Sequence, residues 1–295
     1  MSNDIQDTPK ELTNVLERNK CIDLLKCIAI FLVLVYHSTI CFFDFINEPS
    51  VLSYFRYYLR TLLSPCVSLF FFVNGYLLFK KELDLKKHII KTIRLVILAI
   101  IWSFIKVLVL MLIKKEYLSF NEILLIIWNL QGGWVNSLWF LGALVCIYII
   151  FPILKLAYDI KPKYFNYFII TAAIFTFGNV ILNELGTILN KSMPLQGVNC
   201  FSMFNPFRGI YGYTFVYFCL GGYIYKIEKD IKLIRPLKRN IISIIVMLIC
   251  CLGLFCVGLL YSYINNTIWD IVWNGYDTIF TLGNLNIRVE DVFFL

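Results

Sequence analysis

Long apolar runs recur along this chain, and they restrict the folds open to it more than any other feature. Each run has at least 16 residues and approaches the roughly 20 residues that a helix needs to span a bilayer. The runs cover residues 22–43, 57–79, 95–113, 137–157, 164–182, 210–225 and 241–263, and a weaker run begins near 275. We therefore predict an all-α, polytopic transmembrane helical bundle of about eight spans.

The composition agrees with a membrane environment. Hydrophobic residues make up 60% of the 295 residues and charged residues 16%, whereas soluble domains have about 45–50% and about 25%. We find no internal repeat and no linker that would separate two domains. The sequence thus predicts a multi-pass protein of the cell (cytoplasmic) membrane, with a polar segment over residues 1–20 and one transmembrane domain over residues 21–295.

The basic residues that give the chain its net charge of +8 lie mostly on one side of the predicted spans. Of the 27 lysines and arginines, 19 fall on one side of the predicted spans, before the first and after the second, fourth and sixth. The positive-inside rule makes that side, and with it the N-terminus, cytoplasmic. Because topology accounts for the positive charge, we do not expect nucleic acid as a partner.

Lys26 and His37 share one face of the first predicted span. Eleven helical steps turn about 1100°, close to three full turns, and rise about 16 Å. Asp23 is near enough to pair with Lys26. His37 therefore lies deep in the predicted bilayer, where an ionisable group is costly and is a functional candidate. A neutral imidazole can take a proton from a hydroxyl and return it, although a structural histidine bonded between helices is the alternative.

Other polar groups give weaker indications. His88 lies among lysines, and we expect it to be solvated at the inner surface. The connection from Lys155 to Lys163 is a candidate for binding phosphates or anionic lipid. The predicted outer loops 114–136 and 183–209 carry amides and aromatic rings that suit a sugar, or are ordinary solvated loops. No metal site is predicted, because no ligand cluster joins His37.

Five motifs in order resemble the acyltransferase-3 family, polytopic enzymes that acylate bacterial surface glycans. The first is the basic residue, ten others and a histidine at Lys26 and His37. The others are "LFFFVNGYLLF" (69–79), "KKHIIKTIRLVI" (86–97), "SLWFLGALVCIYIIFPIL" (137–154) and "FVYFCLGGYIYK" (215–226). The resemblance covers most of residues 15–280. The family usually has about ten spans, so this chain, which stops near the eighth, is expected to be truncated at the C-terminus.

The resemblance implies a membrane O-acyltransferase. It would move an acyl group, acetyl in the simplest case, from cytoplasmic acyl-CoA to a hydroxyl of an extracytoplasmic carbohydrate, either a surface polysaccharide or a lipid-linked glycan. Acyl-CoA (acetyl-CoA) is then a co-substrate, and no bound cofactor is expected. His37 would be the general base. The expected acyl-CoA-binding residues are Lys26, Lys87, Lys91 and Arg94, and candidates for substrate or oxyanion contact are Asn74, Tyr76 and Trp139.

Two other classes of protein fit the same residues. A transporter or flippase for a glycan or lipid-linked sugar also needs polar groups in the membrane, and Arg60, Pro65, Asn74 and Lys106 would line its path. A non-catalytic fragment of the family is the other alternative. The sequence shows no paired, interrupted helices of the kind that inverted repeats produce in transporters.

Overall fold

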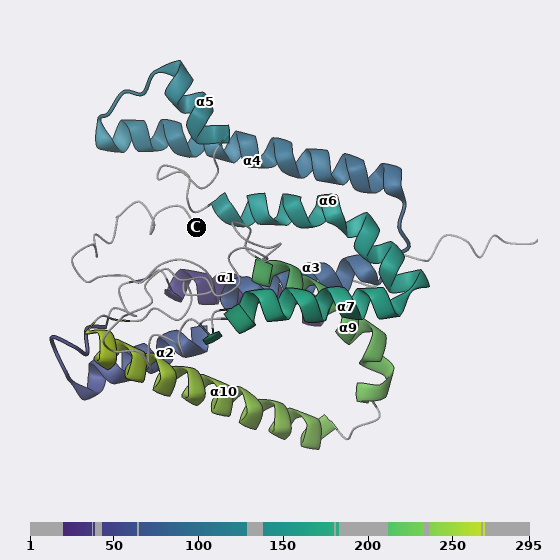
Figure 1. Ribbon diagram of the computed structural model, residues 1–295. Helices are drawn as coiled ribbons and strands as arrows, with labels where there is room; N and C mark the ends of the chain where they lie inside the picture. Colours follow the sequence, from purple (N-terminus) through teal and green to yellow (C-terminus); the bar gives the residue numbers. More distant parts are fainter. Residues whose placement is uncertain are drawn as a thin grey trace, which may run out of the picture.

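The computed structural model describes residues 20–36, 38, 43–63, 65–128, 138–179, 181–182, 212–232, 236–266 and 268. Every regular element within these ranges is a helix (Figure 1). The helices are α1 (Lys20–Tyr36), α2 (Val51–Leu63), α3 (Cys66–Phe79), α4 (Leu85–Lys114), α5 (Phe120–Trp128), α6 (Trp139–Ile160), α7 (Pro162–Ala173), the π-helix η3 (Ile174–Gly178), α9 (Gly212–Lys232) and α10 (Pro236–Asn265). The predicted all-α class is thus confirmed for the described residues.

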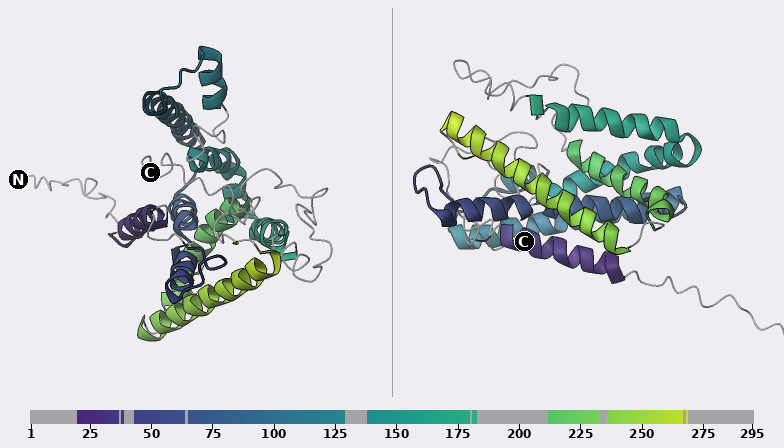
Figure 2. Two further views of the ribbon diagram at one scale, coloured as in Figure 1. Left: turned by 90° about the vertical axis from the view of Figure 1, so that its left-hand side faces the viewer. Right: turned by 90° about the horizontal axis from the view of Figure 1, so that it is seen from below.

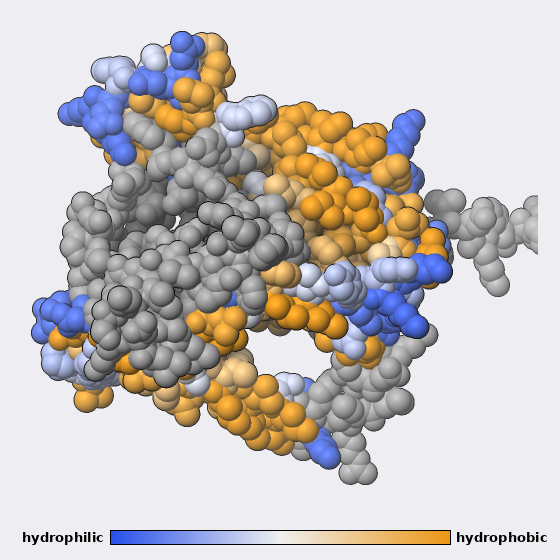
Figure 3. All heavy atoms as spheres, in the orientation of Figure 1, coloured by the Kyte–Doolittle hydropathy of each residue, from blue (hydrophilic) through white to orange (hydrophobic). Residues whose placement is uncertain are grey.

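The surface of the bundle is that of a membrane protein. Four helical stretches are long and apolar enough to cross a bilayer: Val51–Phe79, Leu85–Lys114, Trp139–Ile160 and Asn240–Ile264. Hydrophobic side chains cover the middle of the helices, and hydrophilic ones gather at both ends (Figure 3). Most helices run side by side, and α10 crosses them obliquely (Figure 2). The cytoplasmic position of the N-terminus stays a prediction, and the run near 275 lies outside the described residues.

The third predicted span is longer than the sequence indicated. Asp84 caps α4 by accepting a hydrogen bond from the backbone N–H of Lys87 at 3.1 Å, so the helix begins at Leu85, ten residues before the apolar run. This hydrogen bond, together with the Lys87 ammonium, lowers the pKa of Asp84. The basic cluster therefore belongs to the helix, and the side chains of Lys87, Lys91 and Arg94 project from its first turns.

Two other boundaries differ from the prediction. The run 57–79 is divided into α2 and α3 near Pro65, which lacks a backbone N–H and precedes the first residue of α3. The predicted outer loop 114–136 contains α5, whose start is a capping box. In this box Ser119 donates from its backbone and hydroxyl to Glu122, each at 2.7 Å, and the Glu122 N–H donates back to the Ser119 hydroxyl at 3.4 Å.

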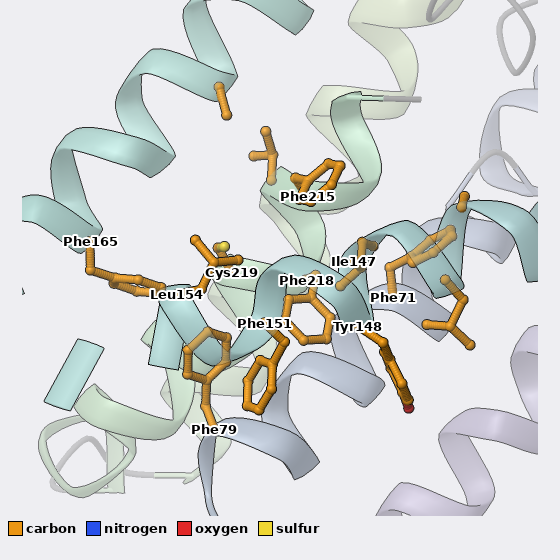
Figure 4. Packing of buried hydrophobic residues seen from close by; sticks show 14 of the residues in the cluster. Phe71, Phe79, Ile147, Tyr148, Phe151, Leu154, Phe165, Phe215, Phe218 and Cys219 are labelled. Atoms are coloured by element: carbon orange, nitrogen blue, oxygen red, sulfur yellow. The ribbon is translucent and has the colours of Figure 1, made fainter. Parts of the chain in front are cut away.

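Helices α3 and α9 meet backbone to backbone at the centre of the bundle. A Cβ built on Gly75 would lie 2.7 Å from the Phe218 carbonyl carbon, and one built on Gly221 would lie 2.6 Å from the Tyr76 amide nitrogen. Both positions therefore need glycine. Around this contact a buried aromatic cluster joins α3, α6, α7 and α9 (Figure 4). Its fully buried phenylalanines are Phe71, Phe79, Phe151, Phe165, Phe215 and Phe218.

Lys155 is buried inside the bundle, which corrects its assignment to an inner surface connection. Helix α6 continues to Ile160, so Lys155 is a helical residue with 5% of its surface exposed. Its ammonium donates to the Phe79 carbonyl oxygen at 2.8 Å and to Asp159 Oδ1 at 2.9 Å. Lys155 thus satisfies a carbonyl at the end of α3 that the helix leaves without a donor.

Replacing Lys155 with methionine should destabilise the bundle. The substitution keeps the length of the side chain but leaves the Phe79 carbonyl without its donor, which costs about 1–3 kcal/mol. Asp159→Asn is the matched control, since the Asp159 side chain is 47% exposed and an exposed pair contributes less than about 1 kcal/mol. Equilibrium unfolding in detergent measures both, and equal losses would contradict this role of Lys155.

Candidate functional site

Helix α1 carries the first predicted site residue. Lys26 lies in the second turn of α1 and is partly exposed. The helix is described to Tyr36, and His37, which follows it directly in the chain, lies outside the described residues. The structure therefore places the start of the Lys26 to His37 motif on a helix and leaves the role of His37 a prediction.

Arg60 of α2 holds the described end of α1. Its guanidinium donates to the Tyr36 carbonyl oxygen at 3.3 Å and to the Tyr36 hydroxyl at 2.5 Å, and Cζ lies 3.8 Å from the centroid of the Tyr36 ring. A cation at a helix C-terminus also offsets the negative end of the helix dipole. Arg60, a candidate for a transport path by sequence, thus contacts the residue before His37.

Two lysines from other parts of the chain lie within electrostatic range of Lys91. Lys26 is on α1, Lys81 follows the end of α3, and Lys91 is near the start of α4. The charges of Lys81 and Lys26 both act on Lys91. Because like charges repel, this lysine group favours a ligand that carries several negative charges. Lys81 was not among the predicted residues.

Tyr148 of α6 lies beside the lysine group and connects it to the interior. The Lys91 ammonium lies 5.1 Å from the centroid of the Tyr148 ring, within the range of a cation–π contact. The Tyr148 hydroxyl donates to Asn74 Oδ1 at 3.4 Å, and Asn74 Nδ2 donates to the Phe70 carbonyl oxygen at 2.8 Å. Figure 4 shows the Tyr148 ring at the edge of the aromatic cluster with its hydroxyl pointing out of it.

The other predicted donor-binding residues have different surroundings. The Lys87 ammonium pairs with Asp84 Oδ2 at 3.0 Å, and its side chain is 85% exposed. Arg94 is exposed, one turn further along α4. The structure therefore brings together Lys26 and Lys91, while Lys87 pairs with the residue that caps the helix.

The three candidates for substrate or oxyanion contact are spread over the bundle. Asn74 reaches Tyr148, as described above. Tyr76, two residues later on α3, packs edge to face on Tyr225 of α9 at 5.6 Å between ring centroids. Trp139 is buried at the start of α6 and contacts the rings of Phe140 and Tyr213. Asn74 is thus connected through Tyr148 to Lys91 of the lysine group.

His88 is buried, so the expectation that it is solvated is wrong. Only 7% of its surface is exposed, and its ring packs on the rings of Tyr148 and Phe151. Nε2 lies 2.7 Å from the Tyr148 carbonyl oxygen. Since a carbonyl oxygen only accepts, Nε2 carries the proton in this bond.

Lys106, one of the four residues assigned to a transport path, is buried on α4 with 6% of its surface exposed. In the described ranges no three His, Cys, Asp or Glu side chains gather where they would hold a metal ion. Tyr148 connects Lys91 of the lysine group, Asn74 and His88 in one region of the described structure.

These features define a class of protein: an α-helical membrane protein with a cationic site beside a buried polar group at one end of its bundle. The chain belongs to the acyltransferase-3 family, whose sequence profile, described as an acyltransferase domain, matches residues 19–284. The family expected from the five motifs is thus confirmed, and it indicates an acyltransferase in a membrane. Comparisons with curated proteins and with solved structures give no match.

Proposed function

We propose that this protein is an O-acyltransferase that moves an acetyl group from cytoplasmic acetyl-CoA to a hydroxyl of an extracytoplasmic carbohydrate. The observation that carries the proposal is that Lys91, which lies over the Tyr148 ring, is within electrostatic range of Lys26 and Lys81 in a member of an acyltransferase family. Coenzyme A carries several phosphate charges, and ammonium groups from three parts of the chain neutralise them together. The acceptor is a surface polysaccharide or a lipid-linked glycan.

The reaction needs one proton carrier. His37 takes the proton of the acceptor hydroxyl, and the oxygen attacks the carbonyl carbon of the thioester. The carbon–sulfur bond then breaks, the ester is released, and the proton passes from His37 to the coenzyme A thiolate. A helical rise of about 1.5 Å per residue predicts about 16 Å between Lys26 and His37, so the phosphates and the reacting carbonyl occupy opposite ends of one elongated donor.

Transfer of label tests the proposal. Membrane vesicles containing the protein are supplied with radiolabelled acetyl-CoA on the cytoplasmic face, and label is measured in the polysaccharide fraction after chase with unlabelled acetyl-CoA. Label that depends on the protein supports an O-acetyltransferase. Glycan that crosses the vesicle membrane without gaining label would indicate the transporter alternative. The absence of both labelling and transport would indicate a non-catalytic protein.

Removing the charges of the lysine group should weaken donor binding. Lys26→Ala and Lys91→Ala should each raise the KM for acetyl-CoA about tenfold, since a hydrogen bond to a charged group contributes about 1.5–3 kcal/mol. The KM for the acceptor should stay unchanged. Lys87→Ala should have a smaller effect, because its ammonium already pairs with Asp84.

Lys114→Ala is the matched control for these variants. Lys114 is the last residue of α4, about 34 Å along the helix from Lys91 at 1.5 Å per residue. If Lys114→Ala raises the donor KM as much as Lys91→Ala does, the lysine group has no special part in binding the donor.

A further inference from the structure

Helix α6 contains a backbone defect beside the lysine group. Pro152 lies inside the helix and has no N–H. In an α-helix the N–H of each residue donates to the carbonyl four residues earlier, so Pro152 leaves the Tyr148 carbonyl without its helical donor. Figure 1 shows α6 changing direction along its length. An unsatisfied carbonyl in a bilayer is costly.

His88 supplies the missing donor from the neighbouring helix. Its Nε2 lies 2.7 Å from the Tyr148 carbonyl oxygen, and its ring is buried between α4 and α6. Three residues further along α4, the Lys91 ammonium lies over the ring of the same tyrosine. Helix α4 therefore contacts Tyr148 of α6 twice: His88 bonds to its backbone carbonyl, and Lys91 lies over its ring.

We propose that His88 is a positioning residue of the donor site: by replacing the hydrogen bond that Pro152 removes, it holds the Tyr148 ring beneath Lys91 and its hydroxyl at Asn74. The inference rests on the proposed function, because it assigns Lys91 and Tyr148 to donor binding. It makes His88 a residue that acts through Tyr148, without contact to the acyl-CoA.

A double-mutant cycle between His88 and Pro152 tests the inference with the full chain in detergent. His88→Leu removes the donor and keeps the volume. Pro152→Ala restores a backbone N–H that can donate to the Tyr148 carbonyl. The loss of thermal stability caused by His88→Leu should therefore be smaller in the Pro152→Ala background, and the two changes should not add.

Binding of coenzyme A, measured by calorimetry, is the second readout. His88→Leu should weaken it about fivefold, as expected for the loss of one hydrogen bond that orders a site. Most of that loss should be recovered in the Pro152→Ala background. His88→Gln, whose side chain amide also donates, should bind coenzyme A more tightly than His88→Leu and serves if the leucine variant does not fold.

The outcomes separate this inference from the proposed function. Equal losses from His88→Leu in both backgrounds would overturn the hydrogen-bond role, and unchanged coenzyme A binding would overturn the positioning role while leaving the proposed function intact. If the unaltered protein binds no coenzyme A, the proposed function and the donor role both fail. Coupling in the stability cycle would still establish that His88 donates to the Tyr148 carbonyl that Pro152 leaves without a helical donor.

Discussion

His37→Ala should lower the rate of acetyl transfer by about 100- to 10,000-fold, the range that a general base contributes. Without the imidazole the acceptor hydroxyl keeps its proton and is a poor nucleophile. Binding of coenzyme A should persist, because the helical spacing of the sequence predicts about 16 Å between Lys26 and His37. Initial rates in membranes, divided by the amount of inserted protein, measure the first effect, and calorimetry with coenzyme A measures the second.

Cys27→Ala is the matched control on the same helix. Cys27 is exposed on α1, and its replacement should change neither the amount of inserted protein nor the rate. If His37→Ala retains a rate close to that of Cys27→Ala, the assignment of His37 as the base is wrong. A rate that falls together with insertion would instead assign His37 a structural part in the bundle.

Gly75→Ala and Gly221→Ala should each destabilise the bundle by about 1–3 kcal/mol or more, the cost of overpacking a well-packed core. The added methyl group meets backbone atoms of the facing helix at both positions: the Phe218 carbonyl for Gly75 and the Tyr76 amide for Gly221. Backbone cannot move aside as a flexible side chain does, so α3 and α9 must separate. Equilibrium unfolding in detergent measures the loss.

Gly253→Ala supplies the control for the glycine variants. A Cβ at Gly253, on α10, would have no atom within 4 Å among the described residues. Alanine favours a helix over glycine by up to about 1 kcal/mol, so this variant should be as stable as the unaltered protein or more so. A comparable loss at all three glycines would show that close approach of α3 and α9 is not what requires glycine.

Hydropathy predicts the membrane helices well and their ends poorly. The predicted apolar runs that correspond to α4, α6 and α10 are confirmed as long apolar helices, because a spanning segment must be apolar over its whole length. The ends depend on single residues. Asp84 extends α4 through lysines that no hydropathy average would include, and α6 continues to Ile160, so that Lys155 is a helical residue buried in the bundle.

The site is partly predictable for a similar reason. Spacing along one helix placed Lys26 on α1, and the resemblance selected Lys91, which the structure brings into electrostatic range of it. The roles of Tyr148 and His88 depend on how α4 packs against α6, and the spacing of residues within one helix does not predict that packing. A signal was present nevertheless, since a proline four residues after Tyr148 indicates a carbonyl that needs a donor.

The glycine contact between α3 and α9 has a consequence for how the bundle can move. With no side chain between their backbones, these two helices form one rigid pair, while the bond from His88 to Tyr148 joins α4 and α6 into a second. Lys155 ties the pairs together at the end of α3. Asn74 and Tyr148, one from each pair, are hydrogen-bonded where the pairs meet, so relative motion of the two pairs would change this contact beside Lys91.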